Sequence, residues 1–419
     1  MVDYTFEGEV NALSEKQQEF VKNVLEELGV KKGKVVIEAV GKPGDNYVAN
    51  VKKLVVEKDG KIFKIIAKIA PTQEIPRQTM NTAICFSNEN MMYSEVLPKF
   101  TQLEKDANIA VEERLKYAKL YGSYLEAPHE IILLEDLTLS DFVMLDRLTS
   151  LKDDSIKLVL KNFAKLHASS YALKNLEPET FEIFAKKLIN IWELMGNVPE
   201  MDKFMKGFST DIINAVDDEK YIDIIDQVMS DLMKEVSALS KIDKGKSYSV
   251  IQQGDPWTNN ILFKLEGDKS IDCCLIDYQI SKESSPVADL TYMIFNCTDF
   301  DTRSKHFHDW INYYHSELER YLNYYGLKTE STYPRNQLDE DFKRYSKFSL
   351  GQSIMMASML IRESKDAGKF KEAMDDNKPM EEIMESTKMT LLDEATLKRF
   401  SNRVIGLIDT FFKLGYLKE

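Results

Sequence analysis

The segment Gln253–Phe263, with the sequence QGDPWTNNILF, is the stretch on which the interpretation of the whole chain depends. It places Asp255 and Asn260 five residues apart, in a loop framed by short apolar segments. Seventeen residues after Asn260, the apolar run Cys273–Ile276 ends at Asp277. Because Asp and Asn interrupt apolar runs at turns, the pattern predicts a compact β region whose loops carry these three side chains.

Upstream of this region, the sequence predicts a β-rich part. Three segments rich in Val and Ile, separated by Gly, Asp and Asn, predict an antiparallel meander over residues 34–40, 47–56 and 62–69. A helix capped by Ser14 and Gln17 precedes the meander. After the meander we expect a helix over residues 82–97 ended by Pro98, a second over residues 111–117, and a strand over residues 130–134.

Beyond Leu137, apolar residues recur at helical spacing. The helices are expected over residues 155–173, 181–194, 221–239 and from 287 onward, with one β region at residues 248–280. The sequence therefore predicts an α+β fold with two lobes, a β-rich N-terminal lobe of residues 1–134 and a helical C-terminal lobe of residues 135–419. The cleft between two such lobes is a usual place for a ligand.

Composition excludes several classes of protein. The 419 residues include 55 Lys and Arg against 69 Asp and Glu, a net charge of −14, which argues against nucleic acid as the main partner. Four Cys residues in this length do not form a disulfide framework. No uncharged apolar run approaches the about 18 residues that a membrane span needs. The N-terminus lacks the basic and apolar regions of a secretory signal, so we expect a cytoplasmic protein.

The three oxygen-bearing side chains suit phosphoryl transfer from ATP to a hydroxyl group. In such a reaction one carboxylate, here Asp255, orients the alcohol and accepts its proton. An amide oxygen and a second carboxylate, here Asn260 and Asp277, hold Mg²⁺ against the phosphates. Taken singly, each could be a turn residue; together with partners upstream, they favour the catalytic interpretation.

Those partners lie in the β-rich part. Lys68 lies on the third predicted strand and Glu89 on the helix that follows. A strand lysine braced by a helix glutamate is how a kinase-type site holds an ammonium against the α- and β-phosphates. The turn that contains Gly44 and Asn46 joins the first two strands and would cover the phosphates, although it is not a Walker loop.

Taken in order, these segments resemble the ecdysteroid kinase-like family, within the CHK kinase-like group of small-molecule kinases that includes choline kinases and aminoglycoside phosphotransferases. The resemblance extends from about residue 30 to the C-terminus. It rests on these segments: Gly44–Tyr47, Ala67–Pro71, Phe86–Tyr93, Leu97–Pro98, Leu134–Leu137, Phe142, Asp146–Arg147, Phe163–Ser170, Gly254–Phe263, Ile276–Gln279 and Ser285–Leu290.

This resemblance implies a protein-kinase-like fold and a kinase that depends on ATP and Mg²⁺. Asp255 resembles the catalytic base of the family, and Asn260 and Asp277 resemble its Mg²⁺ ligands. The implied substrate is a small-molecule alcohol, such as an ecdysteroid or another apolar hydroxylated compound. Asp289 resembles a buried carboxylate that holds the catalytic loop through backbone N–H groups.

The resemblance also implies the nucleotide-binding residues. Lys68 resembles the phosphate-binding lysine, and Glu89 resembles its ion-pair partner. Backbone groups of Glu135 and Leu137 would contact adenine. No nucleic acid and no membrane span are implied.

At one position the chain departs from the family, which usually has a histidine two residues before the catalytic aspartate. Here that residue is Gln253. The histidine normally braces the loop against the metal-binding segment. Because glutamine offers both a donor and an acceptor, it could keep part of this bracing.

Two other functions remain open from the sequence. One is a kinase of the choline or aminoglycoside type, whose substrate is polar and cationic. The other is a catalytically weak protein that keeps the kinase fold and binds a lipophilic ligand, which Gln253 favours. A binding protein has no need for Lys68, Asp255, Asn260 and Asp277 together, which argues against that function. His167, in an apolar helix, is interpreted as a hydrogen-bonded core residue.

Overall fold

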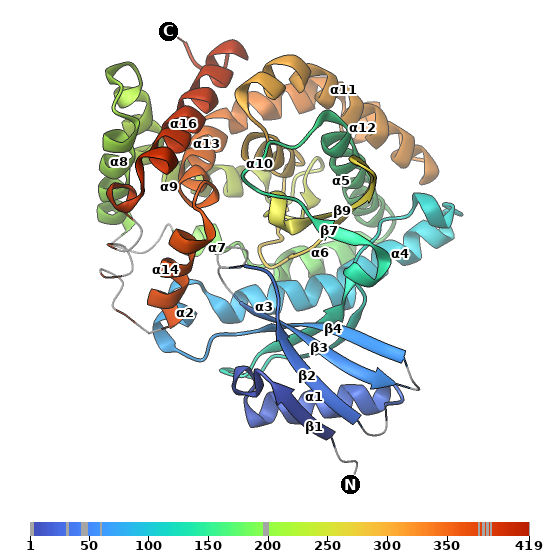
Figure 1. Cartoon of the computed structure of the whole chain (residues 1–419). Helices are drawn as coiled ribbons and strands as arrows, with labels where there is room; N and C mark the ends of the chain where they lie inside the picture. Colours follow the sequence, from blue (N-terminus) through green and yellow to red (C-terminus); the bar gives the residue numbers. More distant parts are fainter. Residues whose placement is uncertain are drawn as a thin grey trace. The chain divides into compact units, whose positions relative to one another are not determined.

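The computed structural model describes residues 4–30, 33–42, 49–58, 61–195, 201–375 and 388–418, and residues 378, 382 and 385 in between (Figure 1). The chain forms two compact units. The first comprises Met1–Ser94, Ala118–Phe142 and Glu363–Thr387, and the second comprises Glu95–Tyr117, Val143–Arg362 and Lys388–Glu419.

The first unit is built on a six-stranded sheet in the order β1-β2-β3-β4-β6-β5. The strands are β1 (Tyr4–Gly8), β2 (Gly33–Ala39), β3 (Asn50–Lys58), β4 (Lys61–Ile69), β5 (Leu120–Tyr124) and β6 (Ile131–Glu135). β1 is parallel to β2, and the other neighbours are antiparallel. The predicted meander is confirmed as β2, β3 and β4 (Figure 1). β1 and β5 were not predicted.

Alternating side chains give this sheet an apolar face. Val35, Ile37, Leu54 and Val56 are buried there, two residues apart on their strands, as a half-buried strand requires. Helix α1 (Glu15–Glu27) packs its own apolar stripe into the same cluster. Its start is confirmed, because the Ser14 side chain accepts from Gln17 N and Gln17 Oε1 accepts from Ser14 N.

The predicted helix end at Pro98 is wrong. α3 (Thr82–Met91) continues through a π-helical turn (Met92–Val96) into α4 (Leu97–Asp106). Pro98 lies in the first turn of α4, where the missing N–H costs nothing. The helix predicted over residues 111–117 is only a 3₁₀ turn at Val111–Glu113.

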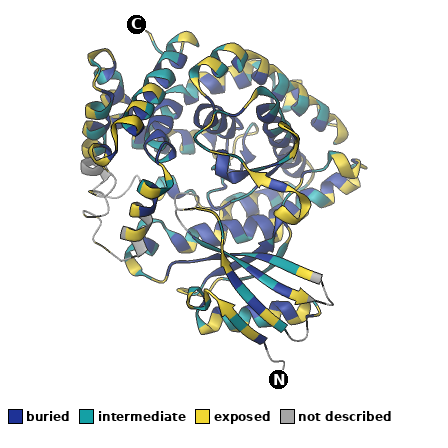
Figure 2. Cartoon of the chain, in the orientation of Figure 1, coloured by how far each residue is buried: buried dark blue, intermediate teal, exposed yellow. Residues whose placement is uncertain are grey.

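The second unit is mainly helical. Its remaining helices are α5 (Asp153–Leu176), α6 (Pro178–Lys187), α7 (Ile191–Met195), α8 (Met201–Val216), α9 (Glu219–Asp243), α10 (Val287–Cys297), α11 (Phe300–Tyr324), α12 (Thr329–Thr332), α13 (Arg335–Leu360) and α16 (Glu394–Lys413). α2 (Glu74–Thr79) and α14 (Ser364–Asp375) belong to the first unit. α5 and α10 are buried over most of their length (Figure 2). The helix predicted over residues 181–194 is divided at Leu188 into α6 and α7.

The predicted β region of the second unit is confirmed. β9 (Ile261–Glu266) and β10 (Lys269–Leu275) form an antiparallel hairpin, and β7 (Phe142–Met144) pairs with β9. β8 (Val250–Ile251) pairs with β11 (Glu283–Ser284). A sheet-based unit and a helical unit with small sheets together give the α+β class that the sequence predicts. No helix of the described chain is both long and apolar enough to cross a membrane.

Gly254 allows the loop after β8 to approach the segment before β11. Its φ is +94°, and a Cβ atom there would lie 2.5 Å from the carbonyl oxygen of Ile280. Only glycine fits this combination of a left-handed backbone and a close backbone contact.

We therefore expect Gly254→Ala to lower the stability of the protein by roughly 2 kcal/mol or more, because strained φ and steric overlap add up. Gly245→Ala is the matched control, since Gly245 also has a positive φ of +72° but a Cβ added there would meet no atom within 4 Å. Thermal unfolding followed by circular dichroism measures both. Equal melting temperatures for the two variants would contradict the close approach.

Candidate active site

The loop that contains Asp255 is held by one buried carboxylate. Asp289, in the first turn of α10, accepts hydrogen bonds from Gln253 N at 2.9 Å and from Gly254 N at 2.8 Å. Its Oδ2 also lies 3.2 Å from His167 Nε2, on α5. Hydrogen bonds to an ionised acceptor are stronger than neutral ones. Asp289 therefore fixes the backbone of the loop, as the family resemblance implies.

His167 is a buried connector between helices. Its Nδ1 lies 2.9 Å from the hydroxyl of Tyr314, on α11, while its Nε2 faces Asp289. The imidazole is fully buried, and both nitrogens have partners. It thus matches the interpretation as a hydrogen-bonded core residue.

Gln253, which replaces the family's usual histidine, makes the bracing contacts with both ends of its amide. Nε2 donates to Ile276 O at 2.8 Å and to Asp277 O at 3.0 Å. Oε1 accepts from Asp255 N at 2.6 Å. The side chain is completely buried, so these contacts are shielded from water. Gln253 therefore links the Asp255 loop directly to the segment that carries Asp277.

Asp255 is half-buried between fully buried neighbours, and both of its carboxylate oxygens have partners. The hydroxyl of Tyr292, on α10, donates to Oδ1. The amide of Asn260 donates to Oδ2 at 3.0 Å and to the Asp255 carbonyl at 2.9 Å. Two donors thus fix the orientation of this carboxylate.

Tyr292 is a site residue that the sequence did not reveal. Burial, and then the negative charge of Asp255, raise the pKa of its phenol well above the ordinary value, so it remains a donor. In the sequence, Tyr292 is marked only by its position three residues after Asp289 in an apolar helix. A tyrosine of the hydrophobic core would have the same position, so the sequence does not identify Tyr292 as a site residue.

One turn further along α10, Asn296 is also buried, and neither polar atom of its amide has a partner in the described chain.

A backbone hydrogen bond joins Asn260 to the residue before Asp277. Ile276 N donates to Asn260 O at 3.0 Å, so the residue before Asp277 is tied to the Asp255 loop. Asp277 adopts a left-handed backbone, with φ of +62°, which turns the chain directly after β10. Within the described residues, the amide oxygen of Asn260 accepts no hydrogen bond.

These two residues offer hard oxygen ligands of the kind that Mg²⁺ prefers. The described residues contain no cluster of three or more His, Cys, Asp or Glu that could hold a metal alone. Two protein ligands with substrate phosphates completing the shell is the usual arrangement for Mg²⁺ in kinases. The donor set therefore fits the metal.

A lysine that the sequence did not single out lies beside this loop. The carbonyl of Lys282 accepts from Gln252 N at 3.1 Å, and the neighbouring Ser281 donates to Gln253 O at 2.9 Å. Burial lowers the pKa of the Lys282 ammonium to about 8, while the carboxylates of Asp289, Asp243, Glu193 and Asp255 oppose this shift. The side chain of Lys282 is half-buried, and Asp255 is one of the carboxylates that favour its charged form.

In the first unit, β4 and α3 bring two of the candidate residues together. Lys68 Nζ lies 2.5 Å from Glu89 Oε2, and both side chains are buried. A charge-assisted hydrogen bond at this depth limits the rotamers of both side chains.

For the other nucleotide-binding candidates, the structure gives the backbone positions of Glu135 and Leu137. Glu135 is the last residue of β6, and its N–H donates to Lys119 O at 2.9 Å, so this donor is already used. Leu137 begins a 3₁₀ turn capped by Asp136. Gly44 and Asn46 lie outside the described residues.

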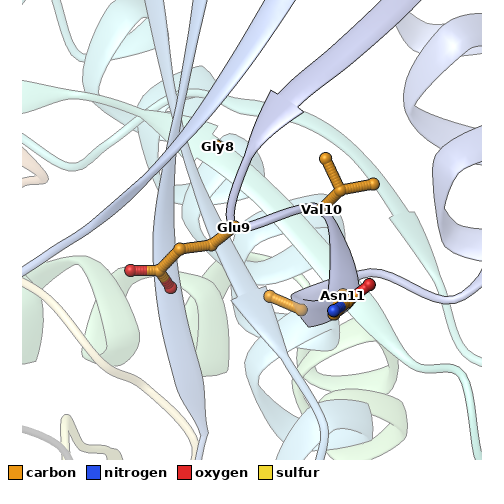
Figure 3. Close-up of a pocket in the computed structure, with 5 residues that line it drawn as sticks. Gly8, Glu9, Val10 and Asn11 are labelled. Carbon is orange, nitrogen blue, oxygen red and sulfur yellow. The ribbon is translucent and has the colours of Figure 1, made fainter.

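A cavity of about 450 Å³ in the first unit has none of the described candidate residues in its described lining (Figure 3). It is lined by residues 8–12, between β1 and α1. Among the described residues of the lining, Glu9 is the one ionisable side chain, and it forms an ion pair with Lys52.

Among solved structures, the chain is similar to two small-molecule phosphotransferases. An ethanolamine kinase from Plasmodium vivax has 15% identity over 96% of this chain and 91% of its own, with a TM-score of 0.42. A GDP complex of a mutant aminoglycoside 2'-phosphotransferase-IIIa has 10% identity over 95% of this chain and 99% of its own, with a TM-score of 0.45. No curated protein sequence matches the chain.

The family assignment rests on the sequence itself. Residues 43–327, more than half of the chain, match the model of the ecdysteroid kinase-like family, EcKL. The matched region contains Lys68, Glu89, Asp255, Asn260, Asp277 and Asp289. The chain therefore belongs to the ecdysteroid kinase-like family.

Proposed function

We propose that this protein is a kinase that transfers the γ-phosphoryl group of ATP, with Mg²⁺, to a hydroxyl of a small apolar molecule such as an ecdysteroid or a hydroxylated xenobiotic. One observation carries the proposal: Asp255 and Asn260 share a loop that Gln253 ties to the segment of Asp277. Membership of a kinase family makes phosphoryl transfer the expected chemistry.

In this reaction Asp255 orients the acceptor hydroxyl and takes up its proton as the new O–P bond forms and the bond between the γ-phosphorus and ADP breaks. Tyr292 and Asn260 keep the carboxylate in one orientation. When Mg²⁺ is bound, it spreads the charge of the transferring group. Asn260 and Asp277 are the side chains that would hold it, and Lys68, paired with Glu89, would bind the α- and β-phosphates.

We assign nucleotide binding to residues 1–134 and acceptor binding to residues 135–419. One feature of the second unit favours a neutral acceptor. The unpartnered amide of Asn296, one turn beyond Tyr292, can donate to and accept from a hydroxyl or carbonyl of the acceptor.

The Gln253 contacts also bear on the alternative of a catalytically weak binding protein. A protein without turnover has no need to keep both ends of this amide engaged with the two loops. We therefore expect Gln253 to hold the Asp255 loop against the Asp277 segment as firmly as the usual histidine would.

The first test is a substrate panel of ecdysteroids, hydroxylated plant compounds, choline and aminoglycosides. We expect ATP consumption with the apolar alcohols, and a product that mass spectrometry finds heavier by one phosphoryl group. Turnover of choline or aminoglycosides alone would support the cationic alternative and contradict our acceptor class. ATP consumption with no member of the panel would favour the binding protein.

The second test replaces the proposed base. With an accepted substrate, Asp255→Asn should lower kcat by about 10²–10⁴-fold, because the amide cannot take up the proton. Binding of ATP should persist, because the proposed role of Asp255 is to contact the acceptor hydroxyl and not the phosphates of ATP. Asp268→Asn is the matched control, because Asp268 is exposed in the turn between β9 and β10 and should leave kcat unchanged. Wild-type turnover in Asp255→Asn would show that another group is the base.

A further inference from the structure

The second unit contains a cavity of about 230 Å³ that the proposed reaction does not use. It lies at the C-terminal end of α10, where the chain passes through Thr298 and Asp299 into α11. Its walls also come from the loop before α5, the end of α13 and the middle of α16. We call it the arginine cavity, because Arg147, Arg303, Arg399 and Arg403 all line it.

The lining is strongly positive. Among the described residues of the lining, four are arginines and Asp299 is the one acidic side chain. Asp299 is also the N-cap of α11, since its Oδ1 accepts from Thr302 N at 2.8 Å. This carboxylate already serves as a helix cap, and it forms no ion pair with Arg303 or Arg403.

Arg303 is buried without an anionic hydrogen-bond partner. It is 2% exposed, and Nε donates to Thr410 Oγ1 at 2.9 Å, Nη2 to Gly406 O at 3.0 Å and Nη1 to Thr298 O. All three acceptors are uncharged. Burial, together with repulsion by Arg403, lowers the pKa of Arg303 to about 9. Burying the positive charge of Arg303 therefore costs desolvation free energy, and a nearby anion would reduce this cost.

Arg403 has unused donors. Its Nη2 donates to Asn296 O, but its Nε is buried and has no partner in the described chain. Burial also lowers the pKa of this guanidinium. Neither Arg303 nor Arg403 forms an ion pair with any described carboxylate. A guanidinium can donate five hydrogen bonds in a planar fork, and this one makes a single bond within the described chain.

We propose that the arginine cavity binds a small oxyanion, namely phosphate or the phosphate group of a monoester, with Arg403 as a direct donor. A phosphate offers several acceptor oxygens and up to two negative charges, which match the fork of Arg403 and the neighbouring charge of Arg303. The volume admits the group with a small substituent. Phe300 and Leu148 give one part of the lining an apolar character that suits such a substituent.

A purely structural role for the arginines explains only part of the geometry. Cations near the carbonyls at a helix C-terminus are stabilising, and Arg403 and Arg303 do contact the carbonyls of Asn296 and Thr298, at the end of α10. This role leaves the buried Nε of Arg403 without a function. It also does not explain why two like charges are placed together.

The experiment is isothermal titration of the full chain with inorganic phosphate and, separately, with phenyl phosphate, at constant ionic strength and without nucleotide. Arg403→Gln should weaken binding of both probes by about tenfold or more, because charge-assisted hydrogen bonds are lost. Lys398→Gln, on an exposed position of the same helix α16, removes one charge outside the cavity and should bind like wild type. Arg403→Lys keeps the charge without the fork and should give an intermediate affinity.

Tighter binding of phenyl phosphate than of phosphate would identify a monoester as the natural ligand, and the reverse would identify free phosphate. Equal affinities in Arg403→Gln and wild type would overturn the proposal, since the phosphate would then bind elsewhere, for example at the nucleotide site. Absence of binding to wild type would overturn it as well. If Arg403→Gln does not fold, Arg403→Lys is compared with Lys398→Gln. Weaker phosphate binding in Arg403→Lys supports the proposal, and equal binding in the two variants overturns it.

Discussion

The carboxylate of Asp289 is the contact on which the candidate active site depends. It lies in the interior, accepts from two successive backbone N–H groups of the loop, and faces the ring of His167. A buried anion with several donors is stable only while those donors stay in place. The loop and α10 are therefore fixed together, and α10 in turn delivers Tyr292 to Asp255. The geometry around the proposed base follows from this one arrangement.

At the position where the family usually has a histidine, Gln253 connects the Asp255 loop with the segment of Asp277. An amide has two N–H donors and one carbonyl acceptor, and here both ends are engaged, with Ile276, Asp277 and Asp255. Because these contacts are neutral, the bracing does not depend on a titrating ring.

Helix α10 holds the Asp255 loop at its first turn and ends at the arginine cavity, where Arg403 contacts the carbonyl of Asn296. The helix thus connects the proposed reaction centre with the proposed anion site.

The sequence predicted those parts of the structure that depend on local patterns. The Val- and Ile-rich segments of the meander and the capping box at Ser14 carry their own signals, and both were correct. Pro98 was misjudged because proline is also compatible with the first turn of a helix. Tyr292 and the arginine cavity could not be predicted, since their significance comes from residues far apart in the chain. Lys68 and Glu89 could be proposed as partners because a strand lysine braced by a helix glutamate is typical of a kinase-type site.

The central claim is that the loop held by Asp289 and Gln253 presents Asn260 and Asp277 to the metal of a nucleotide. The most direct measurement is a crystal structure of the protein with Mn²⁺, in place of Mg²⁺, and a non-hydrolysable ATP analogue, with the metal located by its anomalous scattering. We predict that Mn²⁺ is bound by the amide oxygen of Asn260 and the carboxylate of Asp277. A nucleotide-bound metal coordinated by other side chains, with these two residues out of contact, would contradict the account.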